Sequence, residues 1–175
     1  MRLALALCLA AAPALSEEWS ERGTVTAEVD GLAQLWTTYD LSVGASGASP
    51  RMTDDTGSVR LSILGYRPGE PDAGEGRILL VGVLPDAAPG AAEEVRLALV
   101  GADLVGLRWE TLPGAGTLHV TSLERAGDDG YGRARGDFAG RFCLADGDPE
   151  AATRDPNDCR EVEGHFETEI RFDSM

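Results

Sequence analysis

Apolar and polar residues alternate along most of this chain beyond residue 22, in short runs separated by Gly, Pro and Asp. This two-residue period is typical of a β-strand with one buried face. In the run 160–172 one face would carry Val162, Gly164, Phe166, Thr168, Ile170 and Phe172, and the other Glu161, Glu163, His165, Glu167, Glu169 and Arg171. We therefore expect the first face in the core and the second in solvent.

The same pattern predicts the remaining strands. Asp30-Gly31 lies between the runs 23–29 and 32–38, which is a strong signal for a β-hairpin. Residues 44–58, rich in Gly, Ser and Asp, are expected to form a loop. Further strands are expected over 59–66, 77–84, 95–100, 105–111, 117–124, 131–142 and 160–172.

No segment has a convincing amphipathic helical pattern. The sequence therefore predicts an all-β fold, an antiparallel β-sandwich of about eight to nine strands. A closed lipocalin-like β-barrel is the alternative, because up-and-down strands of this length also suit that architecture.

The first sixteen residues have the features of a secretory signal peptide. Met1-Arg2 precedes an apolar run from Leu3 to Leu15, which is shorter than the roughly 20 residues that a membrane-spanning helix needs. Small residues at Ala14 and Ser16 predict cleavage after Ser16, and cleavage after Ala14 is a second option. We expect residues 17–175 to form a single domain, periplasmic or secreted, with no membrane span.

Removal of the signal peptide would also remove Cys8 and leave two cysteines, Cys143 and Cys159. An even pair in an oxidising compartment predicts a disulfide bond. A redox pair would need Cys-x-x-Cys spacing, and metal binding would need further Cys or His residues nearby.

The chain is strongly acidic, with thirty Asp and Glu residues against fifteen basic residues, all of them arginine, and a formal net charge of −15. A field of this sign repels polyanions, so nucleic acid is not expected as a partner. It favours basic partners or cations instead. The absence of lysine excludes a Walker phosphate-binding motif.

One acidic segment has oxygen ligands at spacings that calcium loops use. Its candidate metal ligands are Asp146, Asp148, Glu150, Asp155 and Asp158. Ala151 and Asn157 stand where an EF-hand would have Gly and Glu, so a solvated acidic loop is the alternative interpretation. The sequence predicts no cofactor, and calcium at this segment is the alternative.

Catalytic motifs are not visible. His119 and His165 are the only imidazoles, and neither has a nucleophile that the sequence identifies. His165 lies between Glu163 and Glu167 on one face of its strand, which is either part of a zinc-ligand set or a solvent-facing histidine. With thirty acids present, a carboxylate pair of the glycosidase type cannot be singled out.

Five aromatic residues are candidates for a sugar-binding surface, with packing in the core or at strand edges as the alternative: Trp19, Trp36, Trp109, Tyr39 and Tyr131. Trp36 is in phase with Gln34 and Thr38, and we expect it to be partly exposed. Trp109 alternates with Leu107, and we expect it to be buried.

Residues near both ends of the chain carry a resemblance to a protein type. These are Val29-Asp30-Gly31 before a strand with Trp36, the segment Gly136 to Cys143, and Cys159 followed by Gly164-His165-Phe166. In these residues the chain resembles small exported bacterial all-β proteins of unknown function. The resemblance implies an exported all-β domain and assigns no catalytic or binding residue.

These observations together favour an exported, non-enzymatic domain that binds a small-molecule ligand or another protein. The alternatives are a carboxylate-dependent hydrolase acting on carbohydrate or an envelope polymer, and a calcium-stabilised structural domain.

Overall fold

The computed structural model describes residues 19–40, 50–55, 58–69, 76–85, 88–100, 108–126, 130–146 and 153–173. Within these segments the backbone forms β-strands and no helix, so the all-β prediction is confirmed. The strands are β1 (Ser20–Val29), β2 (Leu32–Asp40), β3 (Arg51–Asp55), β4 (Ser58–Gly65), β5 (Arg77–Leu84), β6 (Gly90–Ala91), β7 (Glu93–Val100), β8 (Arg108–Ala126), β9 (Tyr131–Asp146) and β10 (Thr153–Asp173). None of the described residues forms a helix long and apolar enough to cross a membrane.

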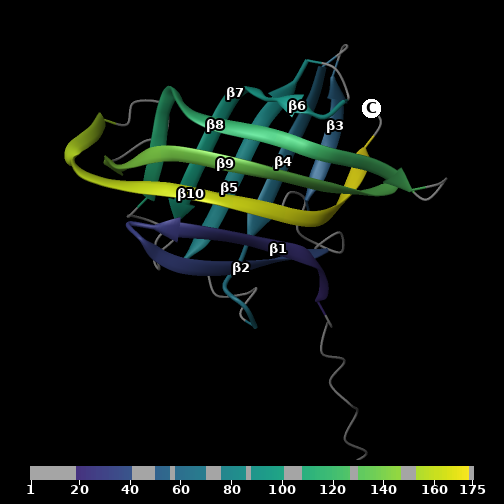
Figure 1. Cartoon of the computed structure of the whole chain (residues 1–175), viewed down its shortest axis with the longest axis horizontal. Coiled ribbons are helices and arrows are strands. Elements are labelled where there is room, and N and C mark those ends of the chain that lie inside the picture. The colour runs from purple at the N-terminus through teal and green to yellow at the C-terminus, as the bar shows by residue number, and fades with distance from the viewer. Residues whose placement is uncertain are drawn as a thin grey trace, which may run out of the picture.

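The strands lie in two layers that cross at a steep angle. In the near layer of Figure 1, β8, β9 and β10 run side by side with the β1–β2 hairpin, while β3, β4, β5 and β7 run behind them. Apolar side chains from both layers form one core between them, which includes Val25, Leu61, Leu80, Phe142 and Phe166. This packing of two sheet faces on a shared core is sandwich-like, as the sequence predicts.

Strand pairing continues around the edges of the two layers. A hydrogen-bonded path runs from β10 through β9, β8, β7, β5, β4 and β3 and returns to β10. All of these pairings are antiparallel except the short contact between Arg171–Asp173 of β10 and Arg51–Thr53 of β3, which is parallel. Strand pairing therefore joins the two layers at both edges, a feature that the closed-barrel alternative also has.

The two faces of β10 are as predicted. Val162, Phe166, Thr168 and Ile170 are buried, whereas Glu163 and His165 on the other face are exposed. The expected hairpin around Asp30-Gly31 is also present, and both turn residues have positive φ, 51° and 77°. Asp-Gly suits this turn because both residues tolerate positive φ at low cost.

Three strand assignments differ from the sequence prediction. Arg51–Asp55, expected in a loop, forms β3, because it finds partners on both sides in β4 and β10. Residues 108–111 of the expected strand 105–111 and the expected strand 117–124 are parts of one strand, β8, with an irregular register between Thr111 and Gly116. Residues 105–107 lie outside the described part of the chain. The two-residue strand β6 was not expected, and it pairs with β8.

The predicted disulfide is confirmed between Cys143 of β9 and Cys159 of β10. These residues lie directly opposite each other in the antiparallel pair. The hairpin extends beyond the bond, because β9 continues to Asp146 and β10 begins at Thr153.

The prediction for Trp36 is wrong, because its side chain is only 1% exposed. Thr38, on the same face as Trp36, has a hydrogen-bond partner inside the protein. Its hydroxyl group shares a hydrogen bond of 2.6 Å with that of Thr168, and both residues are fully buried. The Trp36 indole N–H donates to the carbonyl oxygen of Gly76 at 2.6 Å. Trp109, expected to be buried, is only partly buried and packs against the edge of the core.

A candidate binding groove on the outer sheet face

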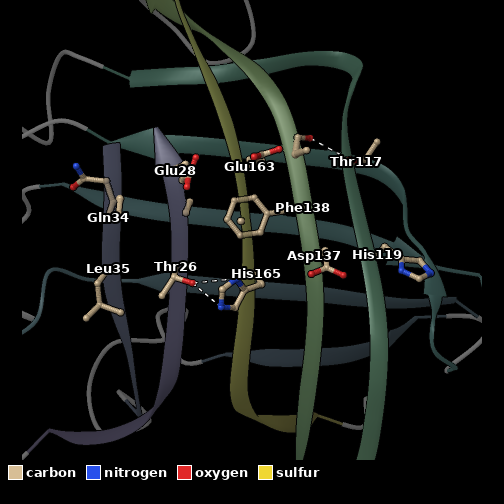
Figure 2. Close-up of a pocket in the computed structure, with 14 residues that line it drawn as sticks. Thr26, Glu28, Gln34, Leu35, Thr117, His119, Asp137, Phe138, Glu163 and His165 are labelled. Atoms are coloured by element: carbon tan, nitrogen blue, oxygen red, sulfur yellow. Dashed lines mark hydrogen bonds between the residues drawn. The ribbon is translucent and has the colours of Figure 1, made fainter. Parts of the chain in front are cut away.

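The solvent-facing side of the near layer carries two rows of residues that cross several strands. We call the first the histidine row: Leu35 of β2, Thr26 of β1, His165 of β10, Asp137 of β9 and His119 of β8 are successive cross-strand partners. Figure 2 shows these side chains on neighbouring strands, with dashed lines between Thr26 and His165. Residues far apart in the sequence therefore meet on one surface.

The neighbouring row lies one pleat along the same strands, and we call it the carboxylate row. It consists of Ala33 of β2, Glu28 of β1, Glu163 of β10, Ala139 of β9 and Thr117 of β8. Glu28 and Glu163 are exposed and lie directly opposite each other. Two like charges in such a pair repel each other and destabilise the sheet.

Both rows line one open groove with a volume of about 810 Å³, which we call the outer groove. Two inward-facing glycines, Gly136 and Gly164, allow close strand approach beneath it. A Cβ atom on Gly164 would lie 2.2 Å from the carbonyl oxygen of Thr26, and one on Gly136 would lie 2.3 Å from that of His119. Glycines at such positions are where sheets bend.

The outer groove is acidic. Its lining includes Glu28, Asp137 and Glu163, and none of the described arginines lines it. None of these three carboxylates forms an ion pair with another described residue. Glu167, the next acid along β10, differs because it is within 3.4 Å of Arg133 and 3.1 Å of Arg135.

His165 is held by Thr26. The Thr26 hydroxyl oxygen lies 2.8 Å from Nε2 and 3.2 Å from Nδ1 of the imidazole ring. A hydroxyl nucleophile with a histidine base would need the second ring nitrogen on an orienting acid. Here both nitrogens face the same hydroxyl group, and the His119 ring points away from Asp137 (Figure 2). The described side chains of the histidine row therefore lack the geometry of a catalytic triad and present hydrogen-bonding groups on the groove surface.

The predicted calcium ligands are only partly covered by the structure. Asp148 and Glu150 lie outside the described residues, and Asp146 is the last residue of β9. The Asp155 carboxylate accepts the backbone N–H of Asn157 at 2.8 Å, and that of Asp158 accepts the Trp109 indole N–H at 3.1 Å. Within the described segments no three His, Cys, Asp or Glu side chains gather in a metal-binding geometry. Calcium binding by this segment stays a prediction.

Sequence reasoning identified His165 and Glu163 but did not find the groove. His119 is also named by the sequence analysis, and the two remaining acids of the groove, Glu28 and Asp137, come from two further strands, β1 and β9. The alternating pattern places each of them on a solvent face, and only the register between strands brings them together.

Comparison of the chain with protein-family models, curated proteins and solved structures found no match. The geometry of the chain itself is therefore the basis for a functional proposal.

Proposed function

We propose that this protein is a non-enzymatic binding domain that works in the periplasm or outside the cell and takes a basic ligand in its outer groove. The observation that carries the proposal is the set of three carboxylates, Glu28, Asp137 and Glu163, that line the groove without a cationic partner among the described residues. A cationic ligand would supply the missing charge.

The repulsion between Glu28 and Glu163 supports this proposal. Like charges that face each other on adjacent strands lower stability. A cation bound between the two carboxylates would be attracted by both and would offset their repulsion. Apolar surface is available beside the charges, because Leu35 at the groove edge is 44% exposed. A ligand with an amine or guanidinium group on an apolar body suits both features.

The proposed location rests on two features. The first sixteen residues resemble a signal peptide, and the Cys143–Cys159 bond is of the kind that persists in oxidising compartments. Sequencing the N-terminus of the protein recovered from the periplasm or the medium tests this. We expect it to begin at Glu17, and an intact Met1 on cytoplasmic protein would contradict the location.

Calorimetric titration with a linear polyamine and with a short capped arginine peptide tests the binding proposal. At a physiological ionic strength of about 0.15 M, long-range effects of net charge are largely screened. We expect the double variant E28Q/E163Q to weaken binding at least tenfold, in line with the loss of two charge-assisted contacts.

The matched control is E93Q/E124Q, which changes net charge equally at exposed residues outside the groove. It should leave the affinity within about twofold. Equal weakening by both pairs would mean that only net charge matters and would contradict the proposal. Because E28Q/E163Q also removes a repulsive pair, its melting temperature should not fall, so a loss of binding would not reflect unfolding.

The adjacency of Glu28 and Glu163 also supports the hydrolase as a second candidate, because retaining glycosidases hold two carboxyl groups about 5 Å apart. Incubation with cell-envelope polysaccharide and assay of new reducing ends tests it. Release of reducing ends by the wild type and not by E163Q would establish the hydrolase; no release by the wild type would remove it.

A further inference from the structure

A second cavity lies at one end of the two layers, and Gln34 of β2 lines both it and the outer groove. Several strands begin or end at this cavity, with Val29 last in β1, Arg77 first in β5 and Val100 last in β7. Its volume is about 250 Å³. We call it the arginine pocket, because Arg67, Arg77 and Arg160 all line it.

The charge of this pocket is opposite to that of the protein as a whole. Three guanidinium groups line it, and no Asp or Glu of the described segments does. None of the three arginines forms an ion pair with another residue that the structure describes. Asp158 is close by, but it accepts the Trp109 indole N–H and makes no ion pair with Arg160.

Each guanidinium rests against an aromatic ring. The Arg160 guanidinium carbon lies 4.3 Å from the ring centroid of Trp109, that of Arg67 lies 5.5 Å from Trp36, and that of Arg77 lies 4.9 Å from Tyr66. A stacked guanidinium keeps its N–H groups at its edge, where they remain able to donate to an oxyanion.

Most of these N–H groups lack an acceptor within the described part of the chain. Arg67 donates to Oε1 of Gln34 at 2.6 Å. The Nε atoms of Arg77 and Arg160 are buried and have no hydrogen-bond partner among the residues that the structure describes. A buried donor without an acceptor costs free energy, and a bound oxyanion would remove that cost.

We propose that the arginine pocket binds a small organic oxyanion, a carboxylate or a phosphate monoester, whose apolar body packs beside Trp109. The guanidinium groups of Arg77 and Arg160 donate to the oxyanion. Leu99, Val29 and the indole of Trp109 supply apolar contact. The pocket volume equals that of about eight liquid water molecules, which suits a single ring bearing one acidic group.

The arginine pocket would bind an anion, whereas the outer groove would bind a cation. The two proposals can therefore fail independently. We would titrate the purified, oxidised protein with benzoate, phenyl phosphate and the neutral isostere benzamide, following tryptophan fluorescence and heat. At least one of the two anions should bind tenfold or more tightly than benzamide, and which one does so identifies the oxyanion. If neither anion binds the wild-type protein more tightly than benzamide does, the proposal is wrong. This outcome needs no variant.

Two variants then locate the site. R77Q and R160Q should each weaken binding of the preferred anion at least tenfold. The matched control is R125Q, because Arg125 also rests on an aromatic ring, 4.8 Å from the centroid of Phe172, but does not line the pocket. R125Q should leave the affinity unchanged, and weakening equal to that of R160Q would overturn the assignment. If the pocket variants do not fold, as judged by near-ultraviolet circular dichroism, the comparison of anion with benzamide in the wild type decides.

Discussion

Arg160, which rests on the ring of Trp109, directly follows Cys159, so the disulfide to Cys143 and the cation–π contact fix consecutive residues of β10. β10 is irregular just before this point, because its register with β9 shifts between Asp155 and Cys159. Regular pairing with β9 resumes at the disulfide-bonded residue Cys159, and the next residue, Arg160, lines the arginine pocket.

Removal of the disulfide should lower both stability and anion affinity. The bond closes a loop with a sequence separation of 16, for which chain entropy predicts about 3 kcal/mol of stabilisation. We expect urea unfolding of C143A/C159A to show a loss of this order. Reduced wild-type protein should behave in the same way, and an unchanged unfolding midpoint in both would contradict the prediction.

Glu110 should be essential for folding stability. Its side chain is 2% exposed and pairs with Arg96 at 3.0 Å, with Arg154 at 2.7 Å and with Arg108. Replacing it with glutamine leaves cationic groups around a neutral side chain, and breaking a buried ion pair from one side typically costs about 3–5 kcal/mol. Chemical denaturation of E110Q checks this. E124Q, at an exposed residue, is the control and should change stability by less than about 0.5 kcal/mol.

Gly164 should not tolerate a side chain. Its Cβ atom would lie 2.2 Å from the Thr26 carbonyl oxygen, and backbone cannot move aside cheaply. We expect G164A to lose about 1–3 kcal/mol of unfolding free energy, the range for overpacking. G90A is the control, because no atom of the described residues lies within 4 Å of a Cβ at Gly90. Thermal unfolding of both variants is the measurement. Equal losses of unfolding free energy in G164A and G90A would disprove the steric argument.

Alkaline pH should destabilise the protein through Tyr66. Burial of its ring raises the pKa of Tyr66 above the ordinary value of 10.0, although the nearby Arg77 charge lowers it. The folded state therefore holds the phenolic proton more tightly than the unfolded state does. The resulting stability is complete below about pH 10 and is lost as pH rises through the folded-state pKa.

The measurement is the free energy of unfolding from about pH 9 to about pH 11 in the wild type and in Y66F. The decline should be shallower in Y66F. Burial also raises the pKa of Tyr131, with a further contribution from its hydrogen bond to Asp40, so Y131F should flatten the curve as well. Parallel curves for the wild type and both variants would refute this explanation.

Local pattern was enough to predict the faces of β10, the hairpin at Asp30-Gly31 and the disulfide, because alternation, turn chemistry and cysteine number act over short distances. It failed for Arg51–Asp55, whose strand depends on partners distant in sequence. It also failed for Trp36, because the polar neighbours that suggested exposure find hydrogen bonds in the interior.

Sequence pattern does not predict the outer groove or the arginine pocket, for a related reason. Thr26 and His165 are 139 positions apart and meet through the β1–β10 register. Arg67 and Arg160 stand isolated in the sequence, and isolated arginines do not indicate a site because they are usually solvated surface residues. Their grouping around one pocket depends on where strands end in three dimensions, which no local spacing encodes.

The position of β10 in the sheet also constrains how the protein can be made. β10 pairs with β1, β3 and β9, all of which precede it in the sequence. A ribosome must therefore release residues up to about Asp173 before the two layers can close, and pairings of such long range form slowly. During that interval the nascent chain carries unpaired strand edges, a state suited to translocation and to capture by holding chaperones.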